Sequence, residues 1–478
     1  MSALGRAARA LLATLGMTVL VLSGMEGALR IVGWETPLSL RGDPYVNLLP
    51  FFRPARGAHG IPLMRHLNGP VEFLAHKPVN GFRVFVLGES SVAGVPYPPE
   101  YAFAAFLQRR LSAALPGFAV EVVNCGVSAG ASWHLVRVAR EVVNYAPDVV
   151  ILYAGHNDYV VREPPPELAW LERAARLRLV QVGVRAGIAL RRWRRGTFDP
   201  SEAGATYQPL LIRERASGNN RLTAQERARV LQRFAANVRA IIALTRSAGA
   251  IFVATTVAQN LHDWEPGASV HQPDLPEGAV ARWDHWLAKG DVSAGTNDCR
   301  GALHFYDRAA AIDRRPARLH FARARCLERF GAWSAARQEY RRASDLDGVP
   351  MGAPTALNVL IRRLAQGKGV PLANVERALA ARAPHHLPGN DRFVDYIHPN
   401  LQAHQEIAAI LAETLRRHAI PLPMGRWVQR RDVDVEPSEI LRMHPELARY
   451  ERLIRIACLY SENRTAEAER ERAALDLH

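Results

Sequence analysis

Ser90 stands in a turn whose residue types suit nucleophilic catalysis. Gly88 precedes it and Gly94 follows it, so the backbone can turn tightly and leave the hydroxyl at the rim of a sheet. A serine attacks an acyl carbon when a histidine takes its proton and a carboxylate orients the imidazole. Asp395 and His398, three positions apart, supply both groups. This combination predicts acyl transfer through a serine triad.

Acyl transfer also needs hydrogen-bond donors for the oxyanion that forms on the carbonyl oxygen. Gly126 follows a predicted strand and can present its backbone N–H without a side chain in the way. Asn157 follows the next predicted strand and can offer its side-chain amide. The four cysteines form no CxxC pair and no spacing with histidine that suits a metal, so neither a zinc site nor a redox motif is indicated.

Two neighbouring side chains leave alternatives open. Ser91 directly follows Ser90 and is the alternative nucleophile. His156 lies between Gly155 and Asn157, where it either contacts the substrate or packs against the neighbouring loop.

The elements that must position these residues alternate between strands and helices. Each of three apolar strands runs into one of the motifs described above, and helical periodicity follows the first two. This alternation predicts a parallel, doubly wound sheet whose ligands bind beyond the carboxyl ends of the strands. The strands are predicted at Phe82–Leu87, Phe118–Asn124 and Asp148–Tyr153, and the helices at Tyr101–Leu115 and Trp133–Asn144.

The rest of the chain extends this core. A helix near Ala224–Arg246, a strand at Ile251–Val257 and an amphipathic helix at Leu401–His418 belong to it. Between them, Ala302, Tyr306, Ala309 and Asp313 recur as Ala336, Tyr340, Ala343 and Asp347, at a spacing of 34 residues. That period is typical of tetratricopeptide repeats, and two repeats are too few to stand alone, so they are expected to pack on the core.

The motifs resemble those of the SGNH/GDSL hydrolase family. The resemblance implies a flavodoxin-like three-layer core, with Ser90 as nucleophile, His398 as general base and Asp395 as its orienting acid. It also implies an oxyanion hole made by the Ser90 and Gly126 amides and the Asn157 side chain. The resemblance implies no metal and no cofactor. Glu89 departs from the family, which usually has aspartate there, and activity is expected to survive this change. Ala403 is a second departure, because the family often has glycine in this helix. The resemblance is carried by Gly88-Glu89-Ser90, Gly126, Gly155-His156-Asn157-Asp158 and Asp395-x-x-His398-Pro399-Asn400.

The N-terminus predicts a membrane segment. Arg6 and Arg9 precede an uncharged apolar run from Ala10 to Met25, and an extension to Trp34 gives the roughly 20 residues that a spanning helix needs. No clear cleavage site follows, which favours an uncleaved anchor with the body in the periplasm or at the cell surface. A cleaved signal peptide and a buried amphipathic helix are the alternatives. The net charge of +15 is spread through helical stretches, which argues against nucleic-acid binding.

Three functions fit these features. The first is hydrolysis of carboxylic esters, the second is transfer of an acyl group to an envelope carbohydrate, and the third is a non-catalytic scaffold that binds a protein partner through the repeats. The expected substrate is an acyl ester, either a lipid or an acylated carbohydrate, in a bacterial envelope. The expected regions are 1–35 as anchor or signal, 36–80 as linker or lid, 81–275 as the first part of the core with a helical insertion at about 165–222, 276–352 as the repeat-like insertion, 353–420 as the second part of the core, and 421–478 as a helical tail.

Overall fold

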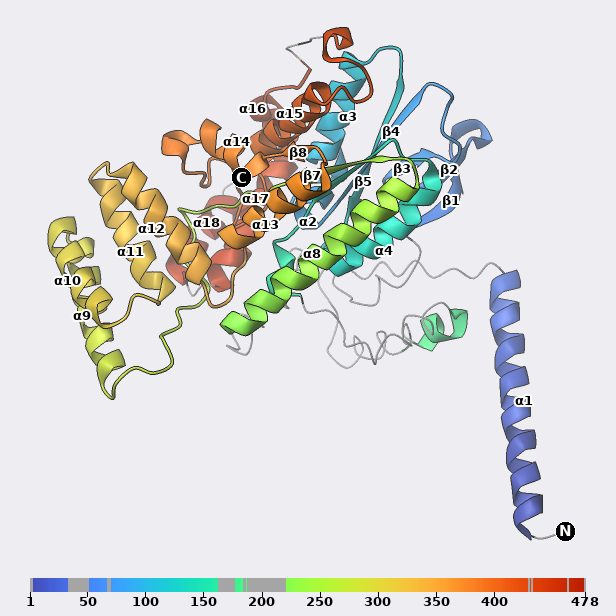
Figure 1. The fold of residues 1–478 in the computed structure, drawn as a ribbon, viewed down its shortest axis with the longest axis horizontal. Helices are drawn as coiled ribbons and strands as arrows, with labels where there is room; N and C mark the ends of the chain where they lie inside the picture. Colours follow the sequence, from blue (N-terminus) through green and yellow to red (C-terminus); the bar gives the residue numbers. More distant parts are fainter. Residues whose placement is uncertain are drawn as a thin grey trace.

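A five-stranded parallel sheet forms the centre of the molecule (Figure 1). The computed structural model describes residues 3–32, 51–66, 70–161, 177–183, 186, 221–428, 430, 433–461 and 464–476. The sheet has the order β5-β4-β6-β7-β8, which is the flavodoxin-like order. The predicted α/β class with a parallel sheet is therefore confirmed. The strands are β4 (Gly81–Gly88), β5 (Ala119–Gly126), β6 (Val149–Tyr153), β7 (Ile251–Thr255) and β8 (Leu372–Ala373).

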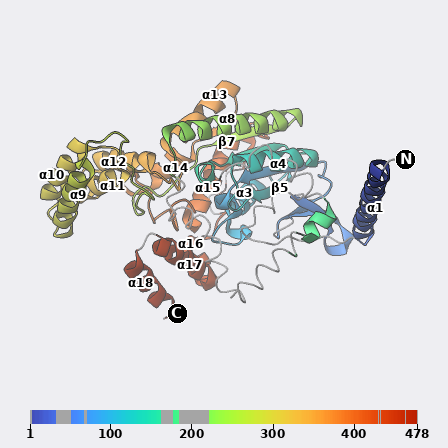
Figure 2. The same ribbon diagram turned by 90° about the horizontal axis from the view of Figure 1, so that it is seen from below.

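Helices cover both faces of this sheet, which gives three layers (Figure 2). The strands between them read as almost continuous apolar runs because both of their faces are buried. One face carries α3 and α15, which pack against each other, and the other face carries α4, α8 and α13. These helices are α3 (Phe103–Ala114), α4 (Ser132–Val142), α8 (Ala224–Ser247), α13 (Thr355–Lys368) and α15 (Leu401–Arg417).

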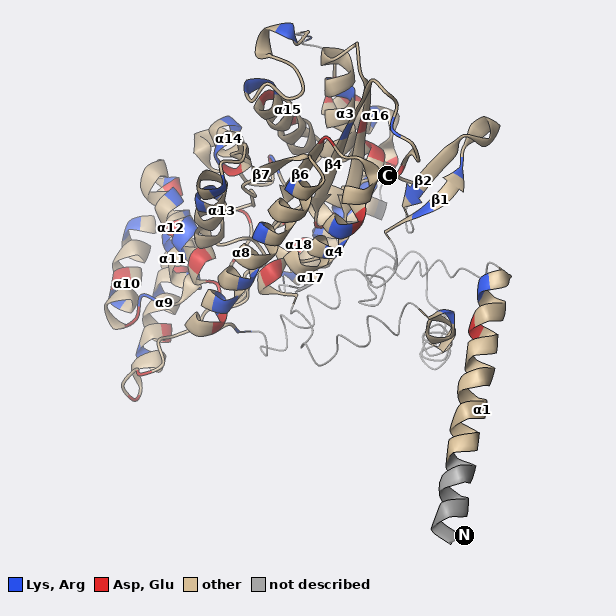
Figure 3. Cartoon of the chain, turned by 45° about the vertical axis from the view of Figure 1, so that its right-hand side comes forward, with Lys and Arg blue, Asp and Glu red and all other residues tan. Residues whose placement is uncertain are grey.

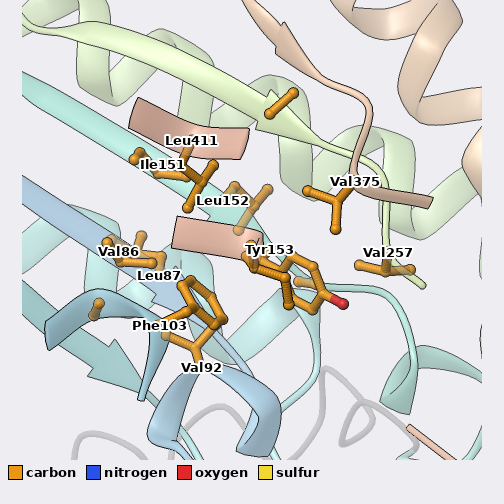
Figure 4. Close-up of a cluster of buried hydrophobic side chains, with 14 of the residues drawn as sticks. Val86, Leu87, Val92, Phe103, Ile151, Leu152, Tyr153, Val257, Val375 and Leu411 are labelled. Carbon is orange, nitrogen blue, oxygen red and sulfur yellow. The ribbon is translucent and has the colours of Figure 1, made fainter. Parts of the chain in front are cut away.

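The core lies directly behind the carboxyl ends of the strands (Figure 4). Tyr153 at the end of β6 packs there with Phe103 from α3, with ring centroids 5.5 Å apart, and Leu411 from α15 belongs to the same buried cluster. Arg83 is the exception to the apolar pattern of β4. Its buried guanidinium donates to Glu121 and to two backbone carbonyl oxygens, so its charge and its donors are satisfied.

A small antiparallel sheet precedes the core, where the Pro- and Gly-rich composition predicted only a linker or lid. Its order is β1-β2-β3. Phe52 and Phe73 from this sheet pack edge-on against Phe85 of the core, which fixes the segment to the main body. Most of the predicted linker between the anchor and this sheet, and most of the predicted insertion at 165–222, lie outside the described residues. The strands are β1 (Phe52–Arg56), β2 (Pro62–His66) and β3 (Glu72–Leu74).

Four consecutive helices form the insertion between β7 and α13, and they lie at one end of the molecule (Figure 1). Gly290 packs on Tyr306, because a Cβ there would lie 2.3 Å from the ring. The equivalent residues Asp313 and Asp347 each accept backbone N–H groups from the segment that leads into the insertion. The two carboxylates therefore both hold the segment that leads into these helices. The helices are α9 (Ala279–Gly295), α10 (Cys299–Ile312), α11 (Ala317–Arg329) and α12 (Trp333–Leu346).

Two further helical regions stand at the ends of the chain. Helix α1 (Ala3–Ile31) contains a segment, Leu12–Ile31, with a mean hydropathy of 1.5 and no buried residues, so it is long and apolar enough to be a membrane anchor or a signal peptide. It carries no charge between Arg9 and Glu26, and Glu26 pairs with Arg30 near its end (Figure 3). The C-terminal helices are α16 (Pro437–Met443), α17 (Pro445–Ser461) and α18 (Thr465–Asp476).

Candidate active site

The predicted motifs meet at the carboxyl edge of the sheet because β4 pairs with both β5 and β6. Gly88 at the end of β4 is opposite Gly126 on one side and Tyr153 on the other. The three loops that follow these strands are therefore neighbours. The chain reverses its direction of winding at this position, which is where α/β sheets commonly bind ligands.

Ser90, His398 and Asp395 form one hydrogen-bonded chain. Ser90 Oγ lies 2.8 Å from His398 Nε2, and His398 Nδ1 lies 2.6 Å from Asp395 Oδ2. An ionised carboxylate can only accept, so the imidazole must donate from Nδ1 and accept the Ser90 proton at Nε2. The three side chains are buried, with exposed fractions of 1% to 5%. Residues 308 positions apart are thus within proton-transfer reach.

Asp395 is held in its ionised form by its surroundings. Burial alone would raise the pKa of this carboxyl group, but the charge and hydrogen bond of His398 and the N–H groups of His398 and Ile397 lower it below its ordinary value. The second carboxylate oxygen accepts those two N–H groups at 2.8 and 2.9 Å. The carboxylate therefore orients the imidazole and can stabilise its protonated form.

Ser91, the alternative nucleophile, faces a different partner. Its hydroxyl donates to the carbonyl oxygen of Ile397 over 3.1 Å. Ser90 and Ser91 are the first two residues of the short helix α2 (Ser90–Ala93). Of these two hydroxyls, the one that lies within hydrogen-bond distance of the His398 imidazole is that of Ser90. The geometry thus favours Ser90 over Ser91.

Gly126 lies close to the nucleophile turn, where there is no room for a side chain. A Cβ at this position would lie 2.0 Å from the backbone nitrogen of Ala93. Its N–H donates to Asn124 Oδ1 over 2.9 Å, and the Asn124 amide in turn donates to Val92 on α2. The N–H of Gly126 must therefore be shared with Asn124 when it serves an oxyanion, as a three-centre hydrogen bond permits.

Glu89 ties the nucleophile turn to the loop of Asn157. Its carboxyl oxygens accept the backbone N–H groups of Gly155 (2.9 Å), His156 (3.1 Å) and Asn157 (3.3 Å). The Asn157 side chain donates one amide hydrogen to Gly130 over 2.8 Å, and its other amide hydrogen has no acceptor among the described residues. The residue before the proposed nucleophile therefore positions a predicted oxyanion donor.

His156 is buried beside this loop and not exposed to solvent. Burial, then the charge of His398, lowers the pKa of its imidazole to about 3 against the opposing effect of Asp395. Its Nδ1 accepts the N–H of Ala353 over 3.2 Å. The contact with Ala353 supports packing against a neighbouring loop. The effect of the His398 and Asp395 charges on this imidazole leaves contact with the substrate open as the alternative.

Two contributors to the site were not predicted. Asn124 precedes Gly126 by two positions and connects β5 to α2. Cys458 on α17 brings its thiol within 3.8 Å of Asp395. The position of Asn124, at the end of a strand and two residues before Gly126, could have indicated a role in the site. Nothing in the sequence around Cys458 indicated its contact with Asp395. Within the described ranges no group of three His, Cys, Asp or Glu side chains is arranged to hold a metal ion.

The structure thus combines a flavodoxin-like sheet order with a Ser-His-Asp chain at its carboxyl edge. No protein-family model and no curated protein matches the sequence. Among solved structures, a GDSL-like lipase from Bacteroides thetaiotaomicron is similar at 11% identity, with a TM-score of 0.32, over 72% of this chain and 93% of its own. An acetylxylan esterase from Geobacillus stearothermophilus is similar at 11% identity and a TM-score of 0.33, over 71% and 95% of the two chains. An alpha/beta hydrolase from the metagenome of Lake Arreo has 16% identity and a TM-score of 0.32, over 70% and 94%.

Proposed function

We propose that the protein is a serine hydrolase of the SGNH/GDSL type that acts on carboxylic esters. The observation that carries this proposal is the continuous hydrogen-bonded chain from Ser90 Oγ through His398 to Asp395. Two supporting features are the obligatory glycine at position 126 and the amide hydrogen of Asn157 that no described residue accepts. They stand on the loops that flank the Ser90 turn, where donors for an oxyanion belong.

The geometry suggests a two-step reaction. Ser90 Oγ attacks the ester carbonyl carbon while His398 Nε2 takes the hydroxyl proton. The carbonyl oxygen becomes an oxyanion and accepts from the Ser90 and Gly126 N–H groups and the Asn157 amide. Collapse breaks the bond to the alcohol, which leaves with the proton from His398. Water then attacks the acyl-enzyme with His398 as base, which releases the carboxylic acid and restores Ser90.

Labelling of the folded protein with a fluorophosphonate probe tests this function. The probe phosphonylates only an activated serine, so peptide mapping should place a single adduct on Ser90. The unlabelled protein should hydrolyse small acyl esters and lose this activity on labelling, and Ser90→Ala should show neither adduct nor turnover. Failure of the wild-type protein to label would leave the scaffold role as the better account. Product analysis with an added carbohydrate acceptor separates hydrolysis from acyl transfer by the same triad.

We also infer a location outside the cytoplasm, with α1 as an uncleaved anchor. The uncharged stretch of α1 follows Arg6 and Arg9, which favours a cytoplasmic N-terminus. Protease added to intact spheroplasts should then digest the body and leave α1 protected. Full protection of the body would place it in the cytoplasm, and an N-terminus beyond α1 in the mature protein would indicate a cleaved signal.

A further inference from the structure

The imidazole of His156 has one nitrogen satisfied and one without a partner. Nδ1 accepts the N–H of Ala353 over 3.2 Å, while Nε2 is buried and makes no hydrogen bond with any described residue. The residue is only 1% exposed. Buried polar groups in native proteins are almost always paired, and an unpaired one costs free energy, so this nitrogen needs an explanation.

The pairing at Nδ1 decides where the proton sits. A backbone N–H can only donate, so Nδ1 must be the acceptor and a neutral imidazole must carry its hydrogen on Nε2. The pKa of about 3 keeps the ring neutral, chiefly through burial and then through the charge of His398. Nε2 is therefore a fixed N–H donor, and it adds no positive charge beside His398 when that residue is protonated during catalysis.

The ring is held on both sides and lies beside the triad. Its own backbone N–H donates to Glu89 over 3.1 Å, and Ala353 belongs to the segment that returns from the helical insertion. The charges of His398 and Asp395 both affect the pKa of the imidazole. His156 is thus held between Glu89, which precedes Ser90, and the segment that follows the insertion, and it directly precedes Asn157.

His404 offers a useful comparison because its Nε2 is also buried and unpaired. Its ring stacks on Phe103 at 5.9 Å and meets Tyr97 edge to face at 5.8 Å, so aromatic faces surround it. An N–H can point at such a face. Among the described residues His156 has one such ring contact, with Tyr153, which is tilted by 54° at 6.2 Å, whereas His404 lies between two aromatic rings.

We propose that Nε2–H of His156 binds a further oxygen atom of the substrate, so that the site selects esters whose alcohol part carries additional oxygens, as an O-acylated carbohydrate does. This inference rests on the proposed esterase function. The carbonyl oxygen goes to the oxyanion donors and the ester oxygen to His398, and a plain acyl chain has no other acceptor. An oxygen of the alcohol part is then the acceptor that the proposal assigns to Nε2–H.

Two substitutions separate this role from simple packing, because each keeps one of the two nitrogen positions. His156→Asn retains an acceptor near Nδ1 for Ala353 and lacks a donor at Nε2, whereas His156→Gln retains a donor near Nε2 and lacks the Nδ1 acceptor. The full-length protein in detergent is assayed with O-acetylated glucose and with phenyl acetate, whose alcohol part carries no oxygen beyond the ester oxygen. His156→Asn should lose about tenfold more in kcat/KM on the sugar ester than on the aryl ester. His156→Gln should keep most of the wild-type preference.

The inference would be overturned if His156→Asn left kcat/KM unchanged and His156→Gln lowered it on both esters. That result would assign the ring a packing role. His134→Asn is the matched control, since His134 is buried and its Nδ1 accepts from Ala131 over 2.9 Å, with no triad residue acting on it. It should leave the ratio of the two substrates unchanged. A wild-type protein that hydrolyses neither ester overturns the proposed function and this inference together. An equal ratio in the wild type and His156→Asn overturns this inference alone.

Discussion

Cys458 Sγ lies 3.8 Å from Oδ2 of Asp395, the same oxygen that accepts His398 Nδ1. The thiol comes from α17, 63 positions after the carboxylate, so the C-terminal tail contacts the catalytic loop. In the same tail, Glu451 accepts the hydroxyl of Tyr97, which follows the nucleophile turn. The tail therefore braces both halves of the proposed triad.

This contact predicts a large difference between two substitutions. Asp395→Asn should lower kcat by about 10⁴, because an amide can donate to Nδ1 and so fix the wrong tautomer of His398. Cys458→Ala should lower kcat by no more than about threefold, because a thiol is a weak donor and Asp395 keeps the N–H groups of Ile397 and His398. Steady-state kinetics on a small ester measures both. Similar losses in the two variants would contradict the assigned roles.

Ser91→Ala separates the two adjacent hydroxyls. Ser91 donates to Ile397 and not to His398, so its loss should weaken the contact between the two loops without removing the nucleophile. We expect fluorophosphonate labelling of Ser90 to persist and kcat to fall by less than about tenfold, since a neutral hydrogen bond contributes about 0.5–1.5 kcal/mol. Loss of labelling in properly folded Ser91→Ala would reopen the choice of nucleophile.

Asn157→Ala should lower kcat by about 10²–10³ with little change in KM, because an oxyanion donor acts mainly in the transition state. The backbone N–H of position 157 still reaches Glu89 in this variant, so the loop should keep its place. Asn144→Ala, at an exposed position between α4 and β6, serves as the control. An equal fall in both variants, or a change in KM alone, would argue against an oxyanion role.

Local sequence was enough to predict the sheet and the order of the site residues. Apolar runs ending in glycine or asparagine predicted β4, β5 and β6 to within two residues, because strands buried on both faces have few polar positions. Their parallel pairing then brings the motif loops together. The small β1-β2-β3 sheet was not predicted, since its strands are short and contain Pro54 and Pro62, and its stability depends on distant aromatic contacts with Phe85.

The supporting contacts of the site could not be predicted, for a related reason. Glu89 reaches three N–H groups more than sixty positions away, and Ala353 meets His156 after 197 positions. Neither contact leaves a periodic or local pattern. The sequence indicated candidate residues for the chemistry, while the interactions that orient these residues depend on the packing of remote segments.

Glu89 predicts a dependence of stability on pH. Burial and then the charge of Asp158 raise its pKa to about 8, despite the N–H groups of Gly155, His156 and Asn157. A carboxyl group whose pKa is higher in the folded than in the unfolded state stabilises the fold while it is protonated. This stabilisation is complete below the unfolded pKa of about 4.3 and is lost as the pH rises through the folded pKa.

Glu89→Gln cannot ionise. Between about pH 5 and pH 9, the free energy of unfolding of the wild type should fall relative to Glu89→Gln by at least about 1 kcal/mol. Parallel pH profiles from urea titrations would contradict this.

The C-terminal tail should behave as part of the catalytic body when its buried residues are truncated. Leu447 on α17 is 1% exposed and belongs to the main core, whereas Tyr450 on the same helix is 41% exposed. Leu447→Ala should reduce the free energy of unfolding by about 2–5 kcal/mol, because it removes a buried side chain and leaves a cavity. Tyr450→Ala should change it by no more than about 0.5 kcal/mol.

Urea unfolding followed through fluorophosphonate labelling of Ser90 measures stability and site integrity in one experiment. If Leu447→Ala unfolds α17 at low urea while labelling persists unchanged, the tail is a separate unit and its contacts with Asp395 and Tyr97 do not support the site.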